Sequence, residues 1–203
     1  LTALFVFLRP LGLRLGQNDA TTLNQIGTQV VSDGYDAVIP IATLAAQCMA
    51  TACESTKTPV IYAAISDPAA ADLTDIDYVT GTSDALNTQS IMDMIFAVQP
   101  EAKTIGIVYT TSEANSVYSI SVYEELATDY GFTIDAVGVT SQAEVTQAVD
   151  TLLSHGVDCL SNLTDNNVVG VLGAILEKTD EAGIPVYGSE VEQVKLGCVG
   201  GAG

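Results

Sequence analysis

The stretch KTIGIVYTTSEANSVYSI, residues 103–120, decides the fold class because it joins two kinds of pattern. Its first seven residues, 103–109, are largely apolar and β-branched, as a strand covered on both faces should be. Three hydroxyl side chains, one carboxylate and one amide follow between Thr110 and Asn115, and an aliphatic and aromatic pattern then resumes. Because Ser and Asn favour the start of a helix, the stretch predicts a strand, a polar loop and a helix in succession.

The same alternation runs through most of the chain. Short apolar runs recur at 37–42, 59–65, 131–139, 157–163 and 184–188. Segments with a helical period lie between them, and two of these segments end at Gly34 and Gly156, since glycine commonly follows the last residue of a helix. Strands and helices in alternation, joined by short loops, predict an α/β fold in which a parallel sheet lies between helices.

Composition excludes some classes of partner. The 203 residues are 48% hydrophobic, which is enough for one large domain or two small ones. Six Lys and Arg residues against 25 Asp and Glu residues give a formal net charge of -19. Such a field repels phosphate backbones and anionic lipid surfaces, so no nucleic acid partner is expected.

Side chains that could carry catalysis or hold a metal are sparse. The four cysteines fit no common zinc spacing, and we expect most of them to be small buried residues. The single histidine, His155, ends a helix, and no nucleophile elbow, phosphate-binding loop or dinucleotide fingerprint is present. A pair of carboxylates such as Asp67 and Asp165 leaves a hydrolase as an alternative, but binding without metal or cofactor is favoured.

Polar side chains gather where the predicted strands end. Ligands of open parallel sheets bind beyond the carboxyl ends of the strands, where loops lead into helices. Five of the six predicted strands are followed by hydroxyl, amide or carboxylate side chains, and four of these ends carry a carboxylate. One such cluster alone is more often a helix cap. Their recurrence favours a zwitterionic ligand, because carboxylates accept from an ammonium while hydroxyls and helix N-termini donate to a carboxylate.

Seven blocks of the sequence carry a family resemblance. They are TLNQI (22–26), IATLAAQ (41–47), AAISDP (63–68), VTGTSDAL (79–86), AKTIGIVYTTSEANSVY (102–118), LTDNNVV (163–169) and IPVYGSE (184–190). In order and approximate spacing they resemble the substrate-binding proteins of ABC importers of the tryptophan/tyrosine type. The resemblance runs from about Gly16 to the C-terminus, and SEANS together with TDN is a fairly specific combination.

The resemblance implies a periplasmic binding protein-like fold. Two α/β lobes, each with a parallel sheet between helices, would form a ligand cleft at the hinge that joins them. The first lobe would cover residues 1–80 and be incomplete, the second would cover 81–203, and the hinge strand would lie near 79–84. Members of the family are longer, so the chain resembles a piece truncated at both ends.

The resemblance also implies location and partners. The protein would work outside the cytoplasm, in the periplasm or as a lipoprotein at the cell surface, although no signal peptide is identifiable in the chain. As a monomer, it would deliver an aromatic or other hydrophobic amino acid to an ABC permease in the membrane. It would use no cofactor and catalyse no reaction. A ligand-sensing domain of the same fold and a flavodoxin-like or hydrolytic enzyme are the alternatives.

Carried over position by position, the resemblance implies which residues face the ligand. Ser112, Asn115 and Ser116 would hold its carboxylate, and Asp165 would accept from its ammonium. Asp67 could instead only shape a turn, and Glu113 could point into solvent. The full set of predicted ligand-binding residues is Thr43, Ala45, Ser66, Asp67, Ser112, Glu113, Asn115, Ser116, Thr164, Asp165, Asn166 and Glu190.

Overall fold

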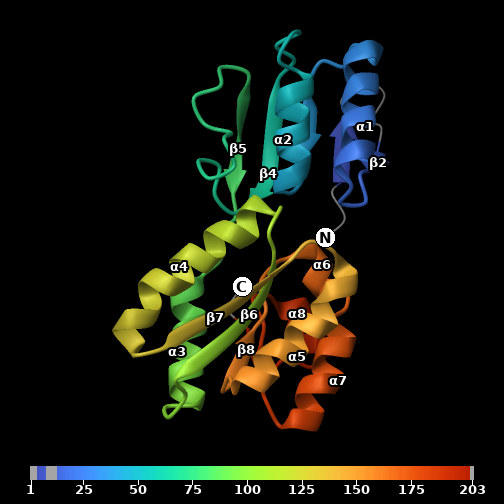
Figure 1. The fold of residues 1–203 in the computed structure, drawn as a ribbon. Helices are drawn as coiled ribbons and strands as arrows, with labels where there is room; N and C mark the ends of the chain where they lie inside the picture. The colour runs from blue at the N-terminus through green and yellow to red at the C-terminus, as the bar shows by residue number, and fades with distance from the viewer. Residues whose placement is uncertain (1–3, 8–12, 202–203) are drawn as a thin grey trace. The chain divides into compact units, whose positions relative to one another are not determined.

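The computed structural model describes residues 4–7 and 13–201, which form two compact units (Figure 1). Unit 1 runs from Leu1 to Ala85 and unit 2 from Leu86 to Gly203. Each unit has its own sheet and its own buried apolar clusters. The limits of the two lobes predicted from the sequence, residues 1–80 and 81–203, stay a prediction.

The sheet of unit 1 has five strands in the order β2-β1-β3-β4-β5. They are β1 (Leu4–Phe7), β2 (Leu13–Leu15), β3 (Val38–Pro40), β4 (Val60–Ile65) and β5 (Val79–Ser83). β3, β4 and β5 are parallel, whereas β1 pairs antiparallel with both β2 and β3. The strands predicted from the sequence, β3, β4 and β5, are thus parallel, whereas β1 and β2 are joined by too few residues for the crossover that parallel strands need.

Two helices of unit 1 bury an apolar stripe. α1 (Ala20–Asp33) begins at Asp19, whose side chain accepts a 2.7 Å hydrogen bond from the Thr22 N–H, and it ends at Gly34 with φ 68°. Leu23, Ile26 and Val30 lie in one buried cluster with residues of β3, β4 and α2 (Thr43–Ala52). The apolar residues that recur with a helical period in the sequence thus form the buried face of α1.

The sheet of unit 2 is parallel throughout, in the order β7-β6-β8-β9. Its strands are β6 (Thr104–Thr110), β7 (Thr133–Val139), β8 (Cys159–Ser161) and β9 (Val186–Tyr187). Its helices are α3 (Thr88–Val98), α4 (Ala114–Tyr130), α5 (Val145–His155), α6 (Asn166–Val169), α7 (Leu172–Ala182) and α8 (Val191–Leu196), with a 3-10 turn at Gln142–Glu144. Every run predicted as a strand contains one, and the α/β prediction is confirmed.

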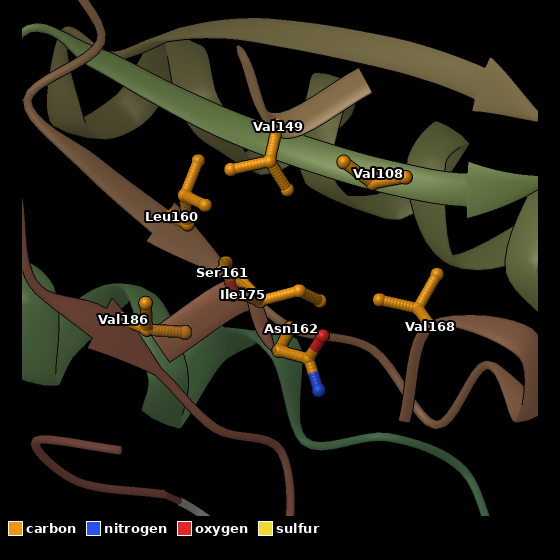
Figure 2. Close-up of a pocket in the computed structure, with 8 residues that line it drawn as sticks. All are labelled: Val108, Val149, Leu160, Ser161, Asn162, Val168, Ile175 and Val186. Atoms are coloured by element: carbon orange, nitrogen blue, oxygen red, sulfur yellow. The ribbon is translucent and has the colours of Figure 1, made fainter. Parts of the chain in front are cut away.

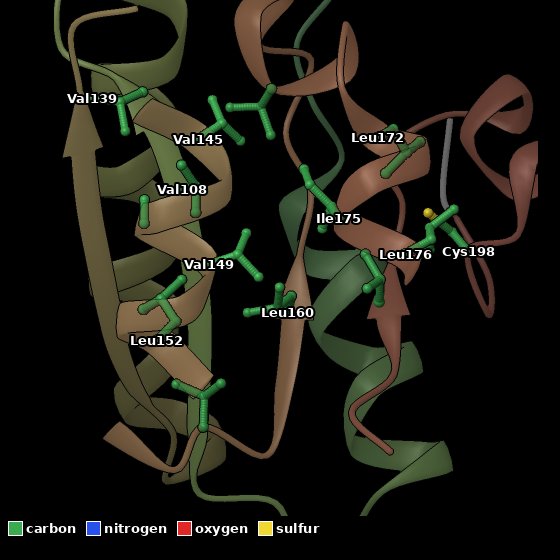
Figure 3. Close-up of a cluster of buried hydrophobic side chains, with 14 residues drawn as sticks. Val108, Val139, Val145, Val149, Leu152, Leu160, Leu172, Ile175, Leu176 and Cys198 are labelled. Atoms are coloured by element: carbon green, nitrogen blue, oxygen red, sulfur yellow. The ribbon is translucent and has the colours of Figure 1, made fainter. Parts of the chain in front are cut away.

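The central strand β6 sends alternate side chains to opposite faces of the sheet. Ile105 and Ile107 lie in the cluster formed with α3 and α4. Val108 lies in the cluster formed with α5 and α7, which Figure 3 shows. Gly106 shares the second face, where an added Cβ would come within 2.6 Å of Leu160 Cδ2. β6 is therefore buried on both faces, which explains its near-continuous apolar sequence.

All four cysteines are buried and free. Burial raises the pKa of the Cys159 thiol to about 12 and that of Cys198 to about 11. The same desolvation raises the pKa of Cys48 and of Cys53. The expectation of small buried cysteines is confirmed. In the described part of the chain, no helix is both long and apolar enough to cross a membrane.

Candidate functional site

The carboxyl edge of the unit 2 sheet is organised around Asp165, which caps α6 and is 0% exposed. Its Oδ2 accepts hydrogen bonds from the Thr110 N–H at 2.6 Å and the Ser116 hydroxyl at 2.7 Å. Its Oδ1 accepts from the Thr110 hydroxyl at 2.8 Å and from the N–H groups of Asn167 and Val168, each at 3.1 Å. A carboxylate has about four lone-pair sites, so groups of the chain itself occupy this one.

The role predicted for Asp165, direct contact with a ligand ammonium, is therefore not the one that its geometry favours. The capping preference of Asp, which the sequence also allowed, describes its contacts better. Ser116 is engaged in the same way: it is 1% exposed, its hydroxyl donates to Asp165, and its N–H donates to the Glu113 carbonyl at 3.0 Å. Both residues serve to hold the edge together.

The loop between β6 and α4 offers donors that remain accessible. Ser112 is exposed and Asn115 is half-buried, and within the described residues their side chains form no hydrogen bond. The backbone N–H groups of Ala114 and Asn115, at the start of α4, have no acceptor in that part of the chain either. The first turn of a helix attracts anions. These groups fit the predicted contact with a ligand carboxylate.

Glu113 is buried, at 6% exposure, so the alternative that it points into solvent is wrong. Its carboxylate accepts from the Asn166 N–H at 3.3 Å and from Asn166 Nδ2 at 3.3 and 3.4 Å. These bonds are longer than those that Asp165 accepts. Glu113 and Asn166 thus link the loop after β6 to α6.

The other predicted residues of unit 2 lie at the same edge. Thr164 is half-buried between β8 and α6. Glu190 is half-buried at the start of α8, where Gln193 Nε2 lies 3.5 Å from its carboxylate. Two residues that sequence reasoning omitted also belong here: Asn167 Nδ2 donates to the Thr110 hydroxyl at 3.2 Å. The available signal was the polar sequence around them, since Thr110 lies two residues before Ser112 and Asn167 directly follows Asn166.

Unit 1 places its predicted residues less favourably. Thr43, the first residue of α2, is buried, and Ala45 lies in the apolar core at 0% exposure. Asp67 Oδ1 accepts from the N–H groups of Ala69 and Ala70 at 2.7 and 3.0 Å, so it shapes a turn as the alternative proposed. Ser66 is half-buried. The accessible polar side chains predicted at this edge are thus reduced to Ser66 and the outer face of Asp67.

The backbone of unit 1 is strained at the same edge. Ala42, which precedes α2, has φ 74° and ψ 157°, and Ala64, near the end of β4, has φ 56°. The two strands are neighbours here, since the Ala42 N–H donates to the Ala63 carbonyl at 3.1 Å. Positive φ is costly for residues other than glycine and is often found at ligand sites. No sequence signal marks these alanines.

Two pockets lie elsewhere in the units. In unit 2, a cavity of about 10 Å³ lies among Val108, Leu160, Val168 and other apolar side chains, together with Asn162, whose buried Nδ2 has no partner in the described chain (Figure 2). It is too small for an amino acid, since about one water needs that space. In unit 1, a pocket of about 340 Å³ lies between later turns of α2 and residues 71–78, with the carboxylates of Glu54 and Asp72 on its rim. The first borders the carboxyl end of β8, which ends at Ser161.

The fold and the polar strand ends define an α/β protein of the ligand-binding kind. No group of three or more metal-binding side chains occurs within the described residues. Residues 13–203 match the family described as ABC transporter substrate binding protein. The chain belongs to this family, so the resemblance read from the sequence is confirmed. The family is non-enzymatic and has the periplasmic binding protein-like fold.

Individual relatives agree with this assignment. The chain is 32% identical over 189 residues to a tyrosine-binding protein of Clostridioides difficile (strain R20291), covering 90% of this chain and 54% of that protein. A solved ABC domain of Streptococcus pneumoniae in complex with L-Trp is 32% identical, with a TM-score of 0.83 over 90% of this chain and 64% of that one. A conserved domain protein of Vibrio cholerae is 27% identical, with a TM-score of 0.84 over 91% and 64%. The chain spans between about half and two thirds of these relatives.

Proposed function

We propose that this chain binds an aromatic or other hydrophobic amino acid for import by an ABC permease. The observation that carries the proposal is the 32% identity, over 90% of the chain, to relatives whose names specify tyrosine binding and a complex with L-Trp. The ligand would lie in a cleft at the hinge between the units. The protein would work as a monomer outside the cytoplasm, where proteins of this family act, and a lipid anchor stays a prediction.

The carboxyl edge of unit 2 would hold the two charges of the ligand. Ser112, Asn115 and the first N–H groups of α4 supply donors for the carboxylate. Glu113, held by Asn166, supplies the negative charge for the ammonium. Thr164 and Glu190 lie at the same edge and complete this half of the site. Ser66 and Asp67 would line the half contributed by unit 1.

The composition of the chain allows a direct test. The sequence contains no tryptophan, so the fluorescence of added L-tryptophan can be excited selectively at wavelengths that are too long for the eight tyrosines of the chain to absorb. We expect the fluorescence anisotropy of L-tryptophan to rise saturably with the concentration of the 203-residue chain. L-Tyrosine should compete. Tryptamine, which lacks the carboxylate, and indole-3-propionate, which lacks the ammonium, carry the same indole fluorophore, so the anisotropy of each reports its own binding. Each should bind at least about tenfold more weakly, since each loses a charge-assisted contact.

Matched variants locate the site. Glu113→Gln should weaken L-tryptophan binding about tenfold while leaving the binding of indole-3-propionate nearly unchanged, because only the ammonium contact is lost. Glu54→Gln and Asp72→Asn, on the rim of the unit 1 pocket, should leave the affinity unchanged. If the folded chain binds no aromatic amino acid, the proposal is wrong; if the rim variants abolish binding, the ligand lies in that pocket instead.

A further inference from the structure

We infer that Asp165 is a positioning residue, which fixes three segments of the unit 2 edge so that the ligand-contacting groups on them are in place before the ligand arrives. The inference rests on the proposed function, because it concerns the same edge. Asp165 would thus raise the affinity for the ligand by ordering the site before binding, and not by contact with the ligand. The basis for this is the set of groups that Asp165 joins.

One oxygen of Asp165 holds both ends of the loop that carries the accessible donors. Oδ2 accepts from the Thr110 N–H at the end of β6 and from the Ser116 hydroxyl in the first turn of α4. Residues 111–115, including Ser112, Glu113 and Asn115, lie between these two anchors. The conformation of the loop is therefore tied at both ends to one carboxylate.

The other oxygen ties this loop to α6. Oδ1 accepts from the Thr110 hydroxyl and from the N–H groups of Asn167 and Val168, and Asn167 Nδ2 returns a bond to the Thr110 hydroxyl at 3.2 Å. Asn166, the neighbour of Asp165, is thereby placed against the Glu113 carboxylate. The pair proposed to bind the ammonium depends on the same junction.

The charge of Asp165 is satisfied by hydrogen bonds alone. Within the described residues it takes part in no ion pair, and it is 0% exposed. A buried carboxylate is stable only when its lone pairs are satisfied. An asparagine at this position would direct an amide N–H at groups that are themselves donors. Replacing one carboxylate oxygen by this nitrogen should therefore break the hydrogen bonds that join the three segments.

The opposite end of β6 supplies a matched control. Asp158 is half-buried, and its Oδ2 accepts from the N–H groups of Lys103 and Thr104 at 2.7 and 2.8 Å. Asp158 thus holds main-chain groups at the amino end of β6, and Asp165 holds one at its carboxyl end. Of these two residues, only Asp165 lies at the carboxyl edge, so only its substitution should change the affinity for the ligand.

The experiment compares Asp165→Asn and Asp158→Asn in the 203-residue chain by amide hydrogen exchange and by binding of L-tryptophan and indole-3-propionate. For Asp165→Asn we expect faster exchange at Thr110, Asn167 and Val168 and about tenfold weaker binding of both ligands, with their affinity ratio preserved. For Asp158→Asn we expect faster exchange at Lys103 and Thr104 and unchanged binding. Ser116→Ala, which removes one donor only, should shift exchange and affinity in the same direction by less if Asp165→Asn does not fold.

Three results would overturn the inference. A collapse of the ratio between L-tryptophan and indole-3-propionate in Asp165→Asn would show direct contact with the ammonium. Equal loss of affinity in both Asp variants would show a general effect of stability. Unchanged exchange at the carboxyl edge would show that Asp165 does not hold it, and this readout decides even if the wild-type chain binds neither ligand, in which case the proposed function fails separately.

Discussion

The carboxyl edges of the two sheets are built by different means. In unit 2, side chains from β6, α4 and α6 converge on the buried carboxylate of Asp165. In unit 1, the corresponding edge has no comparable junction among the described residues, and its shape depends on strained backbone at Ala42 and Ala64 and on a local turn at Asp67. The comparison teaches that residues of the same type at strand ends need not do the same work.

This difference bears on how a ligand would be recognised. A junction of side chains holds donors and acceptors at set positions, which suits the charged ends of an amino acid. A short connection with unusual backbone is found at Ala42, the single residue between Ile41, which bridges to Ala63, and α2. Such a connection instead brings main-chain groups and small side chains close to the edge. We therefore expect unit 2 to set the affinity for the charged groups of the ligand.

The largest predicted effect separates the two aspartates that follow strands. Asp165→Ala removes the acceptor of five donors and should lower the stability of unit 2 by about 3 kcal/mol or more. Asp67→Ala removes two exposed turn hydrogen bonds and should cost unit 1 about 1 kcal/mol. Hydrogen exchange of core amides measures each unit separately; equal costs would contradict the comparison.

A second effect compares two glycines in the sheets. An added Cβ at Gly81 would lie 2.1 Å from the Tyr62 carbonyl oxygen, whereas at Gly106 the nearest atom is Leu160 Cδ2 at 2.6 Å. Backbone cannot move aside as a side chain can, so Gly81→Ala should cost about 3 kcal/mol and Gly106→Ala about 1 to 2 kcal/mol.

Urea unfolding followed by exchange in each unit would measure both costs. The double variant Gly106→Ala with Leu160→Val serves as the control, because the smaller side chain removes the clash and should recover part of the loss. A greater cost at Gly106 than at Gly81 would be evidence against this account of the two sheets.

The smallest effect has the opposite sign. Ala42→Gly should stabilise unit 1 by about 1 kcal/mol, because relief of the positive φ outweighs the conformational entropy of glycine. Ala69→Gly, at an exposed position without positive φ, should instead destabilise by about 0.5 kcal/mol or more. Thermal unfolding of the two variants measures the difference, and a loss of stability in Ala42→Gly would show that its backbone is not strained.

Much of the fold could be predicted from the sequence because it depends on local period. Strands such as β6 are apolar on both faces, and α1 and α5 end at glycines in left-handed conformation, as their patterns indicated. The antiparallel pairing of β1 departs from the general pattern, since it depends on which strand edge is free and not on period. Alternation of apolar and polar residues carries no information on strand direction.

For the candidate site, the sequence indicated which residues of unit 2 lie together but not which hydrogen bonds they form. Clusters at strand ends identified Ser112, Glu113, Asn115 and Asp165 as neighbours, because parallel strands bring their carboxyl ends together. Whether a carboxylate already accepts hydrogen bonds from the chain depends on donors that, for Asp165, lie 49 to 55 residues away in the sequence. No local sequence pattern predicts such distant partners. The strain at Ala42 could not be predicted from the sequence either, since an alanine gives no sign of positive φ.

The shielded cysteines have a practical consequence. Two thiols lie in each unit, Cys48 and Cys53 in the first and Cys159 and Cys198 in the second, and none is exposed. The thiolate is the form that attacks alkylating reagents, and burial both disfavours the thiolate and blocks the reagent. The alkylation rate of each pair therefore reports how often its own unit opens. A pulse of reagent followed by mass spectrometry would measure the two opening rates separately in the same molecule.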